Sequence, residues 1–114
     1  MELDQDLKGG VLVVTPLETR IDAAVAIQFK DRMREVATTA KDRIILDLQR
    51  VDFVDSSGLG AIVAAMKQIG SGVKLELSSL TPNVAKVFRL TRMDTVFAIH
   101  DSTEAALIAG TSDG

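Results

Sequence analysis

The sequence predicts one α/β domain in which helices pack on a mixed β-sheet. The chain of 114 residues is long enough for one hydrophobic core. Apolar runs with strand periodicity alternate along it with stretches of helical periodicity, which is typical of parallel strands covered by helices. Gly9-Gly10 separates the first two runs, as in a hairpin turn, and a hairpin adds an antiparallel pair. We therefore expect the order β-β-α-β-α-β-α-β-α over residues 1–114, with 110–114 as a frayed tail.

The first half of the chain is expected to form two strands, a helix and a buried strand. Residues 3–8 are a weak strand candidate because they are acidic, whereas 11–14 are all apolar. Asp22 is in position to cap a helix over 23–40. Residues 44–48 are almost continuously apolar, as in a strand covered on both faces. The core face of the helix is expected to comprise Ala26, Phe29, Met33, Val36 and Ala40.

The second half is expected to add two more strands and two more helices after the central helix. Residues 73–77 alternate between apolar and charged side chains, which predicts a strand with one exposed face. Thr81 and the proline after it are typical of a helix start. Residues 96–99 form the last expected strand, and Asp101 with Glu104 three positions later fits a capping box for the closing helix.

The segment 51–69 joins a strand to the central helix through the turn Asp55-Ser56-Ser57-Gly58. Two compatible interpretations of the serines are open. Their hydroxyls can cap the helix by accepting hydrogen bonds from its first N–H groups. Alternatively, a hydroxyl is presented beside a helix N-terminus, which is a favourable place for phosphate. The helix is expected to bury a stripe of five apolar residues, namely Leu59, Ile62, Val63, Met66 and Ile69.

The opposite face of this helix is expected to be solvent-exposed and almost free of charge. It comprises Ala61, Ala64, Ala65 and Gln68. Alanine is simply a good helix former, which explains the composition without a function. A smooth face that starts next to an exposed serine also fits a docking surface for a protein partner.

Composition excludes several classes of function. The net charge of −3 gives no reason to expect nucleic acid or an anionic membrane as a partner. No apolar run approaches the ~20 residues that span a bilayer, and the acidic N-terminal segment lacks the basic and apolar regions of a signal peptide. The absence of cysteine excludes thiolate chemistry and fits a reducing cytoplasm. One histidine leaves a transition-metal site short of ligands, and we expect no cofactor.

Four interpretations of the turn as an enzymatic or cofactor-binding site are weak. Gly58 and Gly60 lack the third glycine of a dinucleotide-binding motif, and no phosphate-binding P-loop motif is present. A serine hydrolase needs a base, and His100 is the one histidine, but the flanking residues do not form a nucleophile elbow. Asp22, Asp52 and Asp55 could form a magnesium site, although each also fits a cap or turn.

The apolar run 44–48 is followed by residues 51–60, which contain the Asp-Ser-Ser-Gly-Leu-Gly core. In these residues most of all, the chain resembles the bacterial anti-sigma factor antagonists of the STAS-domain family. The resemblance continues through Thr81-Pro82-Asn83-Val84 and through 97–102, so it covers nearly the whole chain. One departure is Thr19-Arg20-Ile21-Asp22, where the family often has Gly-x-Leu-Asp.

The resemblance implies a binding module without catalytic residues. Family members bind an anti-sigma factor that is also a serine kinase, and so release a sigma factor. The kinase phosphorylates the serine that follows the Asp, which corresponds to Ser56, and a serine phosphatase restores the unmodified form. Asp22, Asp55, Ser57 and Gly58 are then expected to support the phosphorylation site. The alternative is a STAS subunit that acts as a non-switching scaffold in a signalling or transport complex.

Overall fold

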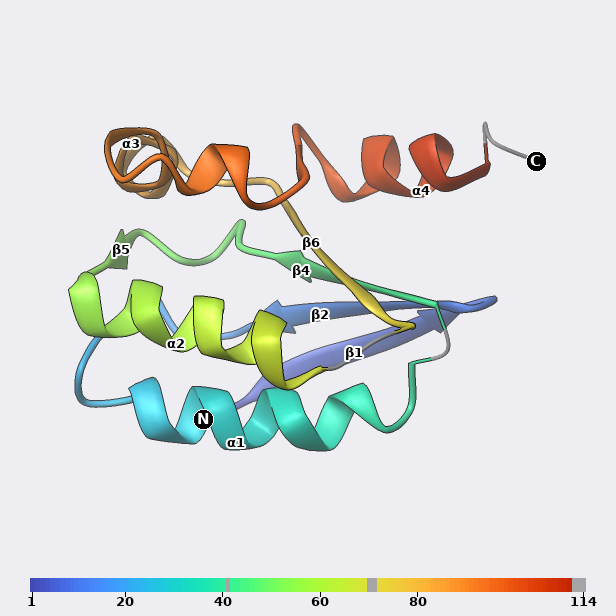
Figure 1. Ribbon diagram of the computed structural model, residues 1–114, viewed down its shortest axis with the longest axis horizontal. Coiled ribbons are helices and arrows are strands. Elements are labelled where there is room, and N and C mark those ends of the chain that lie inside the picture. The colour runs from blue at the N-terminus through green and yellow to red at the C-terminus, as the bar shows by residue number, and fades with distance from the viewer. Residues whose placement is uncertain (41, 70–71, 112–114) are drawn as a thin grey trace.

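The computed structural model describes residues 1–40, 42–69 and 72–111, and its centre is a five-stranded sheet (Figure 1). The spatial order of its strands is β1-β2-β4-β6-β7. β1 and β2 are antiparallel, and all other neighbouring pairs are parallel. The strands are β1 (Leu3–Lys8), β2 (Val11–Pro16), β4 (Arg43–Asp47), β6 (Lys74–Ser78) and β7 (Ile99–His100).

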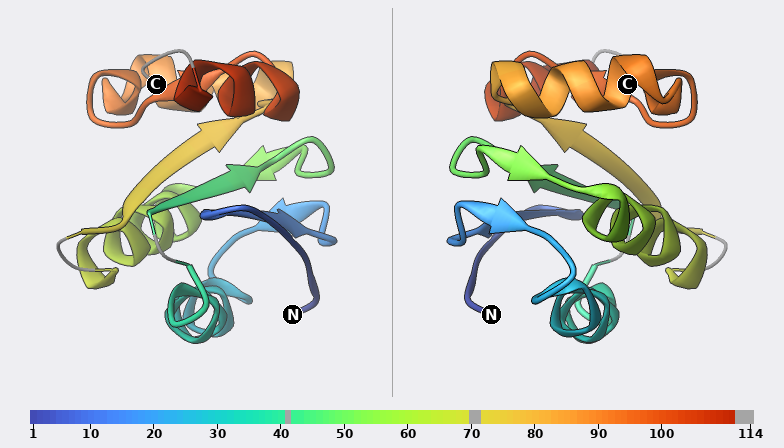
Figure 2. Two further views of the ribbon diagram at one scale, coloured as in Figure 1. Left: turned by 90° about the vertical axis from the view of Figure 1, so that its right-hand side faces the viewer. Right: turned by 90° about the vertical axis from the view of Figure 1, so that its left-hand side faces the viewer.

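The helices divide between the two sides of the molecule. α1 (Ala26–Ala37) and α2 (Ser56–Gln68) lie side by side, whereas α3 (Pro82–Leu90) and α4 (Thr103–Thr111) lie on the opposite side (Figures 1 and 2). Within the described part of the chain, none of these helices is long and apolar enough to cross a membrane.

The sheet has an apolar cluster on each face because successive strand residues point in opposite directions. Ile44 and Leu46 of β4 belong to the large cluster that also contains Phe29 and Ile62. Ile45, between them, belongs to a small cluster with Val13 of β2 and Ala106 of α4. The prediction that this strand is covered on both faces is confirmed.

The predicted order of nine elements is confirmed, with three short additions. β3 (Arg20–Ile21) and β5 (Phe53–Val54) pair in parallel as a separate two-stranded sheet, and η1 (Met93–Thr95) is a single 3₁₀ turn. The strand expected before the serine turn is present as β5, separate from β4, whereas the two residues of β3 are too few to show a period of two in the sequence.

Two predicted helix caps are wrong. Residues 23–25 form a turn after Asp22, and α1 begins at Ala26 with Val25 as its N-cap. Asp22 instead accepts a hydrogen bond from the N–H of Ala24 at 3.1 Å, within that turn. At α4 the side chain that accepts from the helix backbone is Ser102, not Asp101, since its Oγ lies 3.0 Å from the nitrogen of Ala105. Aspartate and serine fit turns and caps alike, so the residue type does not fix the position.

Candidate functional site

Asp55 caps the central helix. Its backbone is extended (φ −95°, ψ −174°), and its Oδ1 accepts a hydrogen bond from the N–H of Gly58 at 2.8 Å. Its carbonyl oxygen accepts from the N–H of Leu59, also at 2.8 Å. Ser56 and Ser57 are therefore the first two residues of α2, and the interpretation of the serines as caps is wrong.

The side chains of Ser56 and Ser57 are exposed at the start of the helix. Among the residues that the structure describes, neither hydroxyl has a hydrogen-bond partner. The helix N-terminus beside them carries a partial positive charge and favours an anion. An accessible hydroxyl at this position can receive a phosphoryl group without first breaking an internal hydrogen bond.

Gly58 is buried where β3 crosses the first turn of α2. A Cβ atom placed on Gly58 would lie 1.8 Å from the carbonyl oxygen of Ile21, so no larger residue fits without moving the backbone. The same carbonyl accepts a hydrogen bond from the N–H of Asp55 at 3.4 Å. The predicted supporting role of Gly58 thus has a physical basis, because its missing side chain lets β3 contact the turn.

The loop after β3 lies against the same turn. Ala23 donates its N–H to Asp55 Oδ2 at 3.3 Å, which links the loop to the cap residue. The Nε–H of Arg20 donates a hydrogen bond to Oδ2 of Asp22, the residue before Ala23, also at 3.3 Å. The structure therefore places Asp22 and Asp55 at one edge, as expected. No group of three or more potential metal-binding side chains gathers in the described residues, so the magnesium interpretation has no support there.

Arg20 and Phe53 are site residues that the sequence reasoning missed. They are opposite each other in the short β3–β5 pair, and the Arg20 guanidinium carbon lies 4.2 Å from the centre of the Phe53 ring. Phe53 is 39% exposed, which is unusual for a large aromatic side chain. The two residues are 33 positions apart, and their pairing depends on β3, which no local pattern indicates.

The predicted docking face on α2 is partly wrong. Ala61 and Ala65 are only 3% and 1% exposed, so they belong to the core and not to the surface. Because α2 packs against the sheet and also beside α1, its buried side is wider than one stripe (Figure 1). Ala64 is half-buried and Gln68 is exposed. The accessible strip that continues from Ser56 along the helix consists of Gly60, Ala64, Lys67 and Gln68.

His100 is held in a partly buried polar network with Glu76 and Arg43. Its Nε2 lies 2.7 Å from Glu76 Oε1, and Arg43 donates to both carboxylate oxygens of Glu76 at 2.6 and 2.8 Å. Burial raises the pKa of Glu76, but the hydrogen bonds from Arg43 and His100 outweigh it, so the pKa lies below its usual value. An ionised carboxylate only accepts, so His100 donates here. The described residues therefore contain no Ser–His pair of the kind a serine hydrolase needs.

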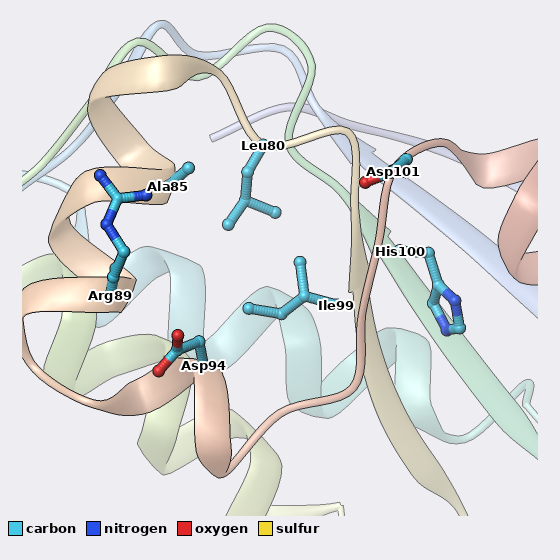
Figure 3. A pocket seen from close by; sticks show the side chains of 7 residues that line it. All are labelled: Leu80, Ala85, Arg89, Asp94, Ile99, His100 and Asp101. Carbon is cyan, nitrogen blue, oxygen red and sulfur yellow. The ribbon is translucent and has the colours of Figure 1, made fainter.

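A cavity of about 390 Å³ lies between α3, η1 and β7 (Figure 3). Leu80 and Ile99 are its apolar residues near the centre of the view, and Arg89 and Asp94 lie on one side. The His100 ring points away from them, consistent with its bond to Glu76. None of the predicted site residues lines this cavity.

Comparison with known proteins identifies the family. The STAS domain model matches residues 3–106. The chain is 30% identical over 110 residues to BtrV of Bordetella bronchiseptica, a candidate anti-sigma factor antagonist, covering 96% of this chain and 94% of that protein. The crystal structure of a candidate anti-sigma factor antagonist from Thermotoga maritima superposes with a TM-score of 0.83 at 26% identity, covering 94% and 92% of the two chains.

The same fold also occurs outside this functional group. A sulfate transporter family protein from Wolinella succinogenes superposes with a TM-score of 0.78 at 18% identity, covering 93% of this chain and 88% of that chain. Likeness at that identity concerns the fold alone. The family model, the fold and the relatives named as antagonists agree, and the chain belongs to the STAS-domain family, with anti-sigma factor antagonists among its relatives.

Proposed function

We propose that this protein is an anti-sigma factor antagonist that is switched off by phosphorylation of Ser56. In the unmodified form it binds an anti-sigma factor that is also a serine kinase, and the sigma factor is released. The kinase then transfers the γ-phosphoryl group of ATP to the Ser56 hydroxyl, and a serine phosphatase later removes it. This cycle takes place in the cytoplasm, where ATP and sigma factors are found. The observation that carries the proposal is the exposed Ser56 hydroxyl directly after the capping residue Asp55, with no hydrogen-bond partner among the described residues.

The local electrostatics support a switch that leaves the fold intact. Phosphorylation adds about −1.5 to −2 charges at neutral pH. Asp55 already places a carboxylate next to Ser56, so the added charge repels an acidic or apolar partner surface. The dipole of α2 offsets part of the cost within the modified chain, since the phosphate lies at the N-terminus of a helix of 13 residues.

The surface next to Ser56 fits a protein partner. The strip Gly60, Ala64, Lys67 and Gln68 carries a single charge and small side chains near the serine. Ala61 and Ala65 take part only indirectly, because they hold α2 in the core and so fix the orientation of this strip. A partner that lies along the strip also covers Ser56, so one phosphate at the end of the strip is enough to disturb the contact.

Phosphorylation of purified variants tests the site. The cognate kinase with ATP and magnesium should modify the wild-type protein and Ser57→Ala, but not Ser56→Ala. Both serines are exposed, and neither hydroxyl caps the helix, so the two alanine variants are a matched pair. Mass spectrometry should locate the phosphate on Ser56. A phosphate on Ser57 or Thr81, with Ser56 unmodified, would overturn the assignment.

A further inference from the structure

Arg20 lies on β3, whose partner strand β5 leads into Ser56, and its contacts are weak. Arg20 lies on the outer face of β3, where it stacks on Phe53 and forms one ion pair with Asp22. The Arg20 side chain is 59% exposed, and that of Asp22 is 23% exposed. An ion pair with so much solvent contact and a single hydrogen bond at 3.3 Å contributes little to stability.

The Arg20 guanidinium lies over the Phe53 ring with its Nε toward Asp22, and the strand register places Asp22 near the capping residue. Arg20 pairs with Phe53 and Ile21 pairs with Val54, so Asp22 comes opposite Asp55 when the register is continued. The bond from Ala23 N–H to Asp55 Oδ2 shows that the loop does lie against Asp55. Because Arg20 Nε reaches Asp22, its side chain leans forward along the strand, toward the end that leads into Ser56.

The remaining distance is within reach of an arginine. Ser56 follows Phe53 by three residues of mostly extended chain, or roughly 10 Å. The long, flexible arginine side chain and the phosphoserine side chain can reach toward each other across that span. The guanidinium offers several N–H donors in a planar fork that matches two phosphate oxygens, whereas its contact with Asp22 uses a single bond.

We propose that Arg20 is the internal partner of the Ser56 phosphate, and that phosphorylation moves its guanidinium from Asp22 to the phosphate. This inference rests on the proposed function, because it takes Ser56 as the modified residue. When the Arg20 guanidinium moves from Asp22 to the phosphate, its positive charge neutralises part of the negative charge that phosphorylation adds. The same movement also withdraws the exposed cation at Arg20 from any partner that contacts this edge. The phosphorylated state therefore differs from the unmodified one in the arrangement of its edge as well as in its charge.

The test measures the phosphate itself and needs no kinase. Phosphoserine is incorporated at position 56 during translation, and its second pKa is followed by ³¹P NMR in the otherwise unchanged chain and in Arg20→Gln. A guanidinium that pairs with the phosphate favours the dianion, so Arg20→Gln should raise this pKa by about half a unit or more. The matched control is Arg34→Gln, which removes an arginine that is 64% exposed and paired with Asp31 at 3.9 Å on α1. It should leave the pKa unchanged.

Two further measurements make the outcome decisive. Asp22→Asn removes the competing carboxylate but keeps an oxygen for the N–H of Ala24, so it should lower the phosphate pKa by more in the parent chain than in Arg20→Gln, where only the loss of a neighbouring charge remains. The ¹⁵Nε resonance of Arg20 should shift on phosphorylation in the chain with Arg20 intact. Equal phosphate pKa values in the parent chain and Arg20→Gln, with no shift of the Arg20 resonance, would overturn the inference. That result would not affect the proposed function. Unchanged partner affinity after phosphorylation of Ser56 would contradict the proposed function, but it would not contradict a contact between Arg20 and the phosphate.

Discussion

The two glycine positions in α2, one buried and one exposed, predict opposite effects of the same substitution. Gly58 and Gly60 are two residues apart in one helix, and Ala replaces each in turn. At Gly60 an added Cβ meets nothing within 4 Å. At Gly58 it would lie 1.8 Å from the Ile21 carbonyl oxygen and 2.6 Å from the Ile21 carbonyl carbon. Both atoms belong to the backbone, so no side-chain rotation relieves the overlap.

The size of the two effects follows from this difference in space. Alanine is favoured over glycine inside a helix by about 0.5–1 kcal/mol, and Gly60→Ala should gain that amount. Gly58→Ala gains less from helix propensity because position 58 lies in the first turn. The new Cβ must also push β3 outward by more than 1 Å to reach an ordinary contact distance from the Ile21 carbonyl. Overpacking of this kind costs about 1–3 kcal/mol, so we expect a net loss of about 2 kcal/mol. At about 4 °C per kcal/mol for a domain of this size, the melting temperatures should differ by about 10 °C.

Thermal and urea unfolding of both variants against wild type measure these values. Circular dichroism follows the transition, and the midpoints give the direction of each change. Gly58→Ala should unfold at a lower temperature than wild type, and Gly60→Ala at a higher one. A Gly58→Ala variant as stable as wild type would refute the close approach of β3 to the helix, and with it the geometry of the site.

Two further predictions concern the core. Glu76→Gln leaves the Arg43 cation without its carboxylate in a largely buried site, so stability at neutral pH should fall by about 2–3 kcal/mol in urea unfolding. The pKa of Glu76 in the folded state lies below its ordinary value of 4.5. The ionised Glu76 therefore stabilises the fold above that pH, and this stabilisation is lost as the pH falls through the lower folded-state pKa. The difference in unfolding free energy between wild type and Glu76→Gln should accordingly disappear in acid. Ala65→Glu places a carboxylate where the alanine is 1% exposed, so circular dichroism should show loss of folding, whereas Gln68→Glu at an exposed position should fold normally. A well-folded Ala65→Glu variant would show that the helix is turned as the sequence pattern suggested.

The strands and helices were predictable where the segment is long enough for its pattern of apolar residues to be recognised. Residues 44–48 could be read as a strand buried on both faces because almost every side chain is apolar. β3 could not, since it has only two residues and forms through contact with the distant segment β5. The same two strands bring Arg20 and Phe53 together, so this part of the site was inaccessible to reasoning from local sequence.

The helix phase of α2 shows a second limit. Its sequence is apolar or small at most positions, so several faces could serve as the buried one. The large residues suggested one stripe, but Ala61 and Ala65 lie in the core because α1 packs beside α2. A small side chain such as alanine is equally compatible with a close contact between two helices and with an exposed helix face. The turn itself was predicted correctly as the join between strand and helix, although the cap is Asp55 and not a serine, since both residue types are good caps.

The most direct test of the proposed switch is the affinity of the anti-sigma factor for two forms of this protein that differ only at Ser56. One form is unmodified, and the other carries phosphoserine at position 56 in every molecule, which intact mass spectrometry verifies. Isothermal titration calorimetry in the same buffer gives both dissociation constants. Phosphorylation should weaken binding at least tenfold, or about 1.4 kcal/mol, while the far-ultraviolet circular dichroism spectrum stays unchanged. Equal affinities for the two folded forms would contradict the switch.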